Sequence, residues 1–403
     1  MKEFTMNNIT EEKVASSICF RLSEEQEMIR QMTADFADNE IKPFAGEWDK
    51  NDHVPYDVLE KMHGLGLTNI GVPAEYGGLG LDNLTRYTVA DELAQRDAGI
   101  GTTVVASSLL ATDPIMVAAN HEQKKWWFGR MLEGAMCAFC LTEPEAGSDA
   151  LGLSMKCTKD GNDWILSGTK QFITNGGFAR QFSVFATMDK SLGNKGINGF
   201  MVDKDFPGVR VGNKEEKLGI RTSSTTEVIF DDVRVPGWMC LGGEGHGTAI
   251  LMETLDYSRT AIAALATGIS TGALNAAIAY ANERKQFGKP ISSFQAIQFM
   301  LADMAATTEA SRLLYQKAAW LQDNGLPFKL ASNIAKMYSA DSAMKNSVDA
   351  VQIFGGYGYS KEYPVEKYMR DAKIMQIFEG TVQVQRMVIG KYLSKDGKLN
   401  YTY

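Results

Sequence analysis

Residues 260–282 read TAIAALATGISTGALNAAIAYAN, a run without a single charged side chain. The run is long enough to cross a bilayer, but it is rich in Ala, Gly, Thr and Ser rather than in Leu and Ile. Its transfer into lipid is therefore unfavourable. Gly268 and Gly272 lie one helical turn apart, a spacing that allows a second helix to pack closely. The run predicts a long buried helix inside a helix bundle and no membrane span.

The C-terminal part around this run has helical periodicity, and the middle of the chain does not. The predicted C-terminal helices are 249–285, 294–324, 327–354 and 382–393. This is the content that a four-helix bundle needs. Before residue 248, short alternating segments are separated by Gly, Asn and Pro, and Asp160-Gly161 is typical of a hairpin turn. The middle segment is therefore predicted to be a small antiparallel β-barrel or sandwich.

The first third of the chain is again helical in pattern. Ser23, followed three residues later by Gln26, is a capping box, and Met28, Met32 and Phe36 then recur every four residues. The fold class is therefore α+β. The predicted segments are a loose extension (1–21), an N-terminal helical domain (22–136), a middle β-domain (137–247) and a C-terminal helical bundle (248–403).

Composition excludes several classes of function. The 403 residues are 44% apolar and 22% charged, as in ordinary globular proteins, and the net charge is -8. A negative chain offers no footprint for nucleic acid and no polybasic surface for membranes. Five cysteines are few and odd in number, which favours a reducing, cytoplasmic location. We interpret Cys137 and Cys140 as buried strand residues, and the four histidines lack the spacing of a metal site.

The pentapeptide Ile377-Phe378-Glu379-Gly380-Thr381 contains the strongest catalytic candidate. Two large apolar residues precede Glu379 and a glycine follows it, so the carboxylate is expected in a partly dehydrated place. Burial raises the pKa of a carboxyl group and makes it a better base near neutral pH. The alternative is an acid that stabilises the N-terminus of the helix that follows.

Four further stretches accompany this pentapeptide in a fixed order. They are FCLTEPEAGSD (139–149), KQFITNG (170–176), RKQFG (284–288), and QIFGG (352–356), which leads through MRDA (369–372) to FEGT (378–381). At these residues the sequence closely resembles the acyl-CoA dehydrogenases, nearest to the short- and medium-chain group. The resemblance covers residues 22 to 393.

The resemblance implies FAD as cofactor, an acyl-CoA substrate, an electron-transferring flavoprotein as electron acceptor, and a homotetramer built as a dimer of dimers. It implies that Glu379 removes the α-proton of the thioester. The charge that develops on the thioester oxygen needs donors. By resemblance these donors are the backbone N–H of Glu379 and a hydroxyl of the flavin. Gly380 lets the backbone approach the substrate closely.

The resemblance also assigns residues to the cofactor and the substrate. Arg284 and Gln286 resemble a pair that reaches the pyrophosphate of FAD, although Arg284 could instead be a cation that stabilises a helix C-terminus. The residues that resemble those around the flavin ring are Leu141, Thr142, Ser148, Phe172, Ile173 and Thr174. Further cofactor neighbours are Thr381 and Gln383, with Gln295, Gln352, Gly355 and Gly356 from a partner subunit. Substrate neighbours are Ser148, Asp256, Arg259 and Gly380.

Asp91, in the predicted helix TVADELA (88–94), is a departure from straight-chain relatives, which usually have two glutamates here. One interpretation is an exposed helix residue, because charged helix residues are usually solvated, or a harmless exchange of glutamate for aspartate. The other comes from relatives that act on cyclohexane- and cyclohexene-carboxyl-CoA, in which an aspartate of this region serves as a base. Aspartate retracts the carboxylate by ~1.5 Å, one carbon–carbon bond, and makes room for a ring.

Three functions therefore remain open at the level of sequence. The first is dehydrogenation of a straight-chain or alicyclic acyl-CoA, with Glu379 and possible help from Asp91. The second is a related flavin-dependent acyl-CoA oxidase that uses oxygen. The third is a CoA-ester-binding protein without catalysis, which the retained Glu379 and the complete set of flavin residues speak against.

Overall fold

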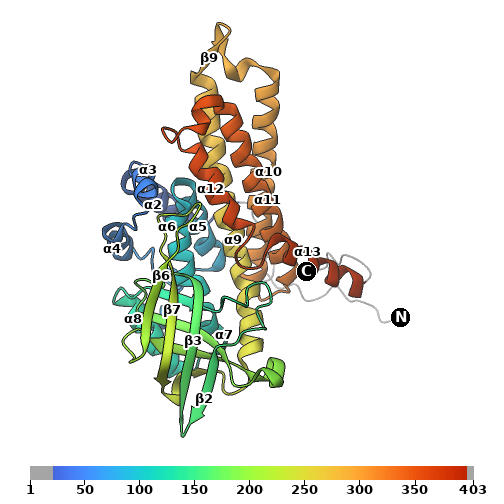
Figure 1. Cartoon of the computed structure of the whole chain (residues 1–403). Helices are drawn as coiled ribbons and strands as arrows, with labels where there is room; N and C mark the ends of the chain where they lie inside the picture. Colours follow the sequence, from blue (N-terminus) through green and yellow to red (C-terminus); the bar gives the residue numbers. More distant parts are fainter. Residues whose placement is uncertain (1–20, 397–403) are drawn as a thin grey trace.

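The computed structural model describes residues 21–396, and the predicted extension of residues 1–21 lies almost wholly outside this range. The chain forms three consecutive blocks: helices, a sheet, and long helices that extend beyond the other two (Figure 1). Helix α2 begins at the predicted capping box, in which the Gln26 N–H donates to Ser23 Oγ and the Ser23 N–H donates to Gln26 Oε1. The first block contains α2 (Glu24–Glu40), α3 (Ala45–Asn51), α4 (Tyr56–Gly64), η1 (Ala74–Tyr76), α5 (Asn83–Arg96), α6 (Ala98–Val105), the π-helical turn η2 (Ala106–Leu110), α7 (Asp113–Ala118) and α8 (His121–Leu132).

The middle block is one sheet with strand order β6-β7-β3-β2-β4-β5-β8, and β1 pairs with β4. The predicted hairpin at Asp160-Gly161 is confirmed as the antiparallel pair β2–β3. The sheet is not purely antiparallel, however, because β1 lies parallel to β4. A long excursion through β2 and β3 separates β1 from β4, so no hairpin fixes their direction. The strands are β1 (Cys137–Cys140), β2 (Lys156–Asp160), β3 (Asp163–Thr174), β4 (Gln181–Thr187), β5 (Ile197–Asp203), β6 (Val209–Lys214), β7 (Thr225–Val235) and β8 (Cys240–Leu241).

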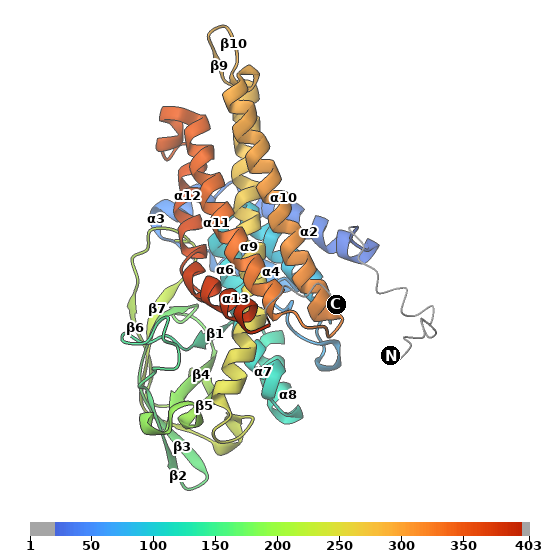
Figure 2. The same ribbon diagram turned by 90° about the vertical axis from the view of Figure 1, so that its right-hand side faces the viewer.

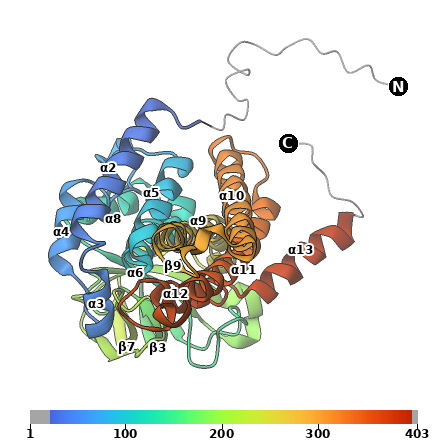
Figure 3. The ribbon, with the colours of Figure 1, turned by 90° about the horizontal axis from the view of Figure 1, so that it is seen from above.

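The third block is a helix bundle whose fourth member differs from the prediction. The predicted helix 382–393 corresponds to α13, and the fourth long neighbour of the bundle is instead α12, which packs on both α9 and α11. Figure 2 shows α9, α10, α11 and α12 side by side, whereas α13 points away from the body in Figure 3. The elements are α9 (Gly247–Glu283), β9 (Lys285–Gln286), β10 (Lys289–Pro290), η5 (Ile291–Ser293), α10 (Gln295–Asp323), α11 (Lys329–Phe354), η6 (Gly355–Tyr359), α12 (Val365–Met375) and α13 (Val382–Asp396).

Helix α9 contains the uncharged run and forms the centre of the molecule. A Cβ built on Gly268 would lie 2.3 Å from the carbonyl oxygen of Asp91, and one on Gly272 would lie 2.5 Å from that of Gln95. Only glycine therefore lets α5 pack this closely on α9. Residues 98–118 and 247–283 are both apolar and long enough to span a bilayer, but 83% and 72% of their apolar 18-residue windows are buried inside the protein. Such burial is typical of core helices.

A buried polar cluster joins all three blocks. The Lys367 ammonium on α12 pairs with Asp97 at 3.0 Å and with Asp371 at 2.6 Å. Asp97 ends α5, and its other oxygen accepts a hydrogen bond from Thr222 of the middle block. The backbone N–H of Ile220 donates to Asp371. This cluster fixes the sheet and the N-terminal helices against the bundle that contains the candidate base.

Candidate active site

Glu379 lies in the loop between α12 and α13 and is half-buried. The Ser258 hydroxyl on α9 donates to Glu379 Oε2 at 2.8 Å. Burial raises the pKa of the Glu379 carboxyl, as its sequence environment predicted. The hydrogen bond from Ser258 and the charges of Arg259 and Lys336 limit the rise. A carboxylate in this state is suited to accept a proton near neutral pH.

The backbone at Glu379 has an uncommon conformation that presents its N–H. Glu379 has φ 54° and Gly380 has φ 82°, both in the left-handed region. Gln385 Nε2 donates to the carbonyl oxygens of both residues at 3.2 Å, and Lys336 Nζ donates to that of Gly380 at 2.6 Å. Within residues 21–396 the backbone N–H of Glu379 donates no hydrogen bond to a backbone carbonyl. This N–H is therefore available to a ligand oxygen.

The alternative interpretation of Glu379, as an acid at a helix N-terminus, is not what the contacts show. Helix α13 begins at Val382, and the Thr381 hydroxyl accepts the hydrogen bond from the N–H of Val384. Thr381 therefore caps α13, while the carboxylate of Glu379 faces Ser258 on α9. Gln383, another expected cofactor neighbour, is exposed on the first turn of α13.

Asp256 and Arg259 lie on α9 beside Glu379 and are both 8% exposed. Arg259 Nη1 binds Asp256 at 2.7 Å, and Lys329 Nζ binds the second oxygen of Asp256 at 2.9 Å. Arg259 Nε and the hydroxyl of Thr254 are buried without a partner. Buried polar groups are normally satisfied, so these two atoms fit a polar ligand that passes along this part of α9.

The expected flavin residues gather where β1 and β3 end. The Gln171 N–H donates to the carbonyl oxygen of Thr142 at 2.9 Å, and Lys170 Nζ donates to that of Leu141 at 2.8 Å. An irregularity of β3 between Lys170 and Ile173 gives Phe172 φ 58° and turns its ring outward, so that it is 57% exposed. Thr142 and Thr174 are half-buried and Ser148 is exposed. An outward ring beside hydroxyl groups and backbone amides fits a flavin.

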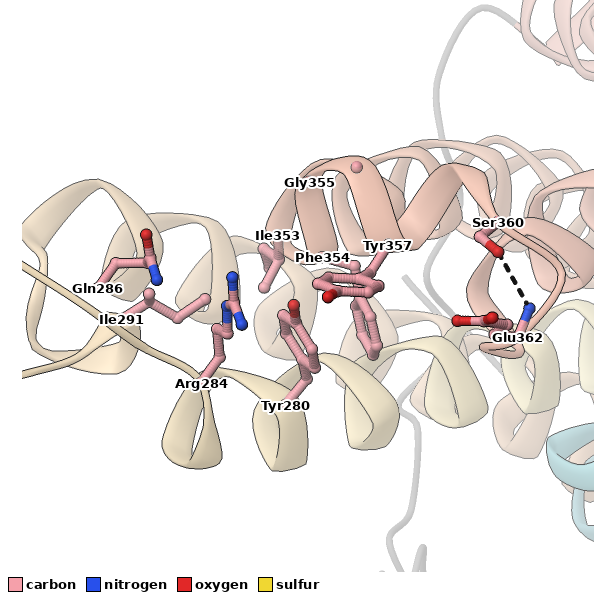
Figure 4. A pocket seen from close by; sticks show the side chains of 11 residues that line it. Tyr280, Arg284, Gln286, Ile291, Ile353, Phe354, Gly355, Tyr357, Ser360 and Glu362 are labelled. Carbon is pink, nitrogen blue, oxygen red and sulfur yellow. Dashed lines mark hydrogen bonds between the residues drawn. The ribbon is translucent and has the colours of Figure 1, made fainter.

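A second group of expected cofactor residues lies at the tip of the bundle. A hollow of about 580 Å³ is lined by Arg284, Gln286, Gly355 and Gly356. The Arg284 guanidinium lies over the ring of Tyr357, 5.3 Å from its centre, and points into the hollow (Figure 4). Arg284 is also the residue that follows α9, so its position agrees with both interpretations given above. Gln295 begins α10 and Gln352 lies in the last turn of α11, both exposed nearby.

The tip and Glu379 are far apart within one chain. Ser258, which binds Glu379, and Arg284 are separated by most of α9. At 1.5 Å per residue this is about 39 Å. A single ligand that contacts both places in one chain would have to span this distance.

The structure does not bring Asp91 together with Glu379. Asp91 is only 3% exposed, so the interpretation as a solvated helix residue is wrong. Its Oδ2 accepts from the Tyr315 hydroxyl at 2.9 Å and from Arg312 Nε at 3.4 Å. Arg312 also binds Thr271, which lies about 20 Å beyond Ser258 along α9. Glu379 is therefore not among the partners of the Asp91 side chain, which faces α10.

Three residues that contact Glu379 or its loop were not predicted: Ser258, Lys336 and Gln385. A fourth, Asp113 at the start of α7, is close enough to be affected by Glu379. Burial raises the pKa of Asp113 to about 7, Arg86 lowers it, and the Glu379 charge raises it further. A lone charge in the otherwise uncharged stretch 330–340 was a usable signal for Lys336, whereas Asp113 carries no local signal. Within residues 21–396 no group of three metal-binding side chains occurs.

Family models cover nearly the whole described chain. The acyl-CoA dehydrogenase N-terminal, middle and C-terminal domains match residues 23–135, 138–233 and 245–394. The short-chain-specific acyl-CoA dehydrogenase of Clostridium acetobutylicum is 44% identical over 371 residues, which are 92% of this chain and 98% of that protein. An acyl-CoA dehydrogenase of Bacillus subtilis is 44% identical over 373 residues, with the same coverage.

Solved structures agree with these relatives. Butyryl-CoA dehydrogenase from Megasphaera elsdenii has a TM-score of 0.91 at 43% identity, covering 94% of this chain and all of that one. A chain from work on the electron transferring flavoprotein of Acidaminococcus fermentans also has a TM-score of 0.91, at 46% identity over 93% of this chain and 99% of that one. A glutaryl-CoA dehydrogenase from Mycobacterium smegmatis in complex with FADH2 has a TM-score of 0.87 at 28% identity, covering 94% and 97%. The chain belongs to the acyl-CoA dehydrogenase family, whose members are FAD-dependent oxidoreductases that act on CH–CH bonds.

Proposed function

We propose that this chain dehydrogenates a short-chain acyl-CoA such as butyryl-CoA, with Glu379 as the base. The observation that carries the proposal is the Glu379 carboxylate, which has a raised pKa and is held by Ser258 beside its own free N–H. The N–H would donate to the thioester oxygen while the carboxylate takes the α-proton, which stabilises the charge that develops. FAD, when bound, accepts the hydride from the β-carbon.

The names of two relatives support a short-chain substrate. The Clostridium acetobutylicum relative is named as short-chain specific and the Megasphaera elsdenii structure as butyryl-CoA dehydrogenase. Asp91 gives no support to a ring-specific enzyme, because its carboxylate already accepts hydrogen bonds from Tyr315 and Arg312.

We also propose an assembly and an electron acceptor. Ser258 and Arg284 lie about 39 Å apart along α9. This distance fits a cofactor that contacts the Glu379 site of one chain and the bundle tip of another chain, as in the expected homotetramer. Electrons would pass to an electron-transferring flavoprotein in the cytoplasm. A structure from work on such a flavoprotein is among those similar to this chain, which supports the pairing.

An anaerobic titration of the purified yellow protein with butyryl-CoA tests this function. We expect the flavin absorbance to bleach, and an electron-transferring flavoprotein to restore it much faster than air. Fast recovery in air would favour an oxidase, an activity named for a structural relative at 31% identity, the prolyl acyl carrier protein oxidase AnaB. Tight binding without bleaching would favour the non-catalytic CoA-ester-binding protein.

A further inference from the structure

A buried lysine lies directly behind the Glu379 loop. Lys336, on α11, is 0% exposed, and its Nζ donates to the carbonyl oxygen of Gly380 at 2.6 Å. Fully buried lysines are rare because the ammonium group loses its hydration. The residues around it on α11 include the small, buried Ser332, Ala335, Ser339 and Ala340. A small apolar side chain would fill this interior at less cost, so the amine is expected to serve a purpose other than packing.

We propose that Lys336 is a positioning residue: its ammonium group fixes the Glu379–Gly380 backbone and supplies a positive charge behind the Glu379 carboxylate. The proposal rests on the proposed function, because it assigns Lys336 a part in the proton transfer to Glu379. Lys336 itself contacts the loop and not the substrate.

The backbone argument starts from the conformation of Glu379. A non-glycine residue at φ 54° is strained and persists only where neighbours hold it. Two of the holding bonds come from the neutral amide of Gln385 at 3.2 Å, and the third comes from Lys336 at 2.6 Å. Hydrogen bonds from charged donors are shorter and stronger than those from neutral ones. The hydrogen bond from Lys336 is therefore the strongest of these three bonds to the loop.

The charge argument considers every group that faces the pair. Glu379 is faced by Ser258 and Arg259 of α9 and by Lys336 of α11, and its charge also acts on Asp113 of α7. Lys336 is faced by Glu379, by Arg259 and by Asp341 of its own helix. Arg259 also pairs with Asp256 at 2.7 Å. Among the charged groups that face Lys336, Glu379 has the largest effect on it, so the charge of Lys336 acts mainly on Glu379.

The two groups stabilise each other's charged forms. Burial lowers the pKa of Lys336 to about 7, and ionised Glu379 opposes that shift. Lys336 in turn lowers the pKa of Glu379, which burial raises. The loss of the ammonium group should therefore make Glu379 harder to ionise, so that the base is active only at higher pH.

Two substitutions distinguish the hydrogen bond that Lys336 donates to the backbone from the effect of its positive charge. Lys336→Met removes both, and Lys336→Gln keeps an N–H donor without the charge. Lys345→Met is the matched control, because Lys345 is an exposed lysine of the same helix that pairs with Asp349. For each FAD-loaded protein, the pH profiles of kcat and kcat/KM for butyryl-CoA and the hydrogen exchange of residues 377–384 without substrate are measured.

For Lys336→Met we expect the acidic limb of both profiles to move up by about one pH unit. At pH values below the pKa of Glu379, both rate parameters should therefore fall by about tenfold, because one pKa unit is a tenfold change in the ionised fraction. Exchange of residues 377–384 should be faster, while KM and FAD content stay within about twofold of wild type. Lys336→Gln should show the shifted limb with slower exchange than Lys336→Met, and Lys345→Met should match wild type.

An unchanged limb together with unchanged exchange in Lys336→Met would overturn the proposal. So would loss of folding or of FAD in both Lys336 variants, because Lys336 would then be a general structural residue. If the wild type does not oxidise butyryl-CoA, the proposed function fails. The exchange comparison would still decide whether Lys336 holds the loop.

Discussion

At Glu379 the cost of burying a carboxylate is partly offset by three neighbours of different kinds. Ser258 donates a hydrogen bond, whereas Arg259 and Lys336 act through their charge. The balance leaves the pKa above its ordinary value, because burial is the largest of these effects. A catalytic base needs a pKa between two extremes. If the neighbours fully cancelled the effect of burial, the low pKa would make the carboxylate a weak base; if they had no effect, the high pKa would keep the carboxyl group protonated.

Glu379→Gln should therefore keep the fold and FAD but lose ~10²-fold or more in turnover, the scale of a general base. Steady-state oxidation of butyryl-CoA measures this, with flavin absorbance as the check on cofactor content. Glu60→Gln, on an exposed face of α4, is the control and should behave as wild type. Turnover of Glu379→Gln near the wild-type rate would remove Glu379 from the role of base.

Asp113 should make the stability of the protein depend on pH. Burial raises its pKa to about 7 in the folded chain, so the folded state holds a proton that the unfolded state releases near pH 4. Stability is therefore lost as the pH rises through this interval and stays lost above it. Asp113→Asn should raise Tm by an amount that grows from pH 4 to pH 7 and then levels. The exposed Asp57→Asn is the control, and a pH-independent change in Tm would contradict the assignment.

At the scale of elements, α5, α9 and α10 pack through contacts of two kinds. The backbones of α5 and α9 meet at Gly268 and Gly272, and the buried Asp91 of α5 is bound by Tyr315 and Arg312 of α10. The glycine spacing predicted the first contact because it is a local pattern. The partners of Asp91 are more than 200 residues away in sequence, so no local pattern could show whether its carboxylate faces solvent, substrate or another helix.

Gly268→Ala should destabilise the protein strongly, because the new Cβ would lie 2.3 Å from a backbone oxygen that cannot move independently. Gly64→Ala, near the end of α4, is the matched control, since nothing lies within 4 Å of its Cβ position. Alanine in a helix is favoured over glycine by up to about 1 kcal/mol, so this control should be neutral or slightly stabilising. Thermal unfolding distinguishes the two, and equal Tm values would contradict the close contact.

Asp91→Asn should lower stability by about 1–3 kcal/mol, because it removes the nearer of the two carboxylates that pair with the part-buried Arg312. It should alter kcat/KM for butyryl-CoA and for cyclohexanecarboxyl-CoA by the same small factor. Asp303→Asn, an exposed change on α10, is the control. A selective loss on the ring substrate would restore Asp91 as a catalytic candidate.

For the whole molecule, the order of helical, strand and helical blocks could be predicted because it depends on local signals, such as the capping box at Ser23 and the turn at Asp160-Gly161. Helix α12 was missed because its sequence, VEKYMRDAKIM, carries charges on most turns and resembles a surface segment. Two of those charged residues, Lys367 and Asp371, are nevertheless buried, and Lys367 pairs with Asp97 of the N-terminal block. No local pattern predicts that Ser258 contacts Glu379, because only the tertiary fold brings α9 to this loop. Lys336 stands out in the sequence as a lone charge, but its contact with the loop also depends on the tertiary fold.

If the proposed homotetramer is correct, Arg284 acts in a neighbouring copy of the chain. The hollow at the bundle tip lies about 39 Å from Ser258 along α9, so we expect Arg284 to serve a flavin near Glu379 of a second copy. If it binds the cofactor pyrophosphate there, Arg284→Ala should lower FAD content and weaken the oligomer together, because a ligand shared between subunits stabilises both. Lys289→Ala, which removes an exposed cation from the adjacent hairpin, should change neither. The flavin-to-protein ratio and the oligomer mass, measured on the same samples, decide between the interpretations. A variant with full flavin and an unchanged oligomer would leave Arg284 as a residue that only stabilises the end of α9.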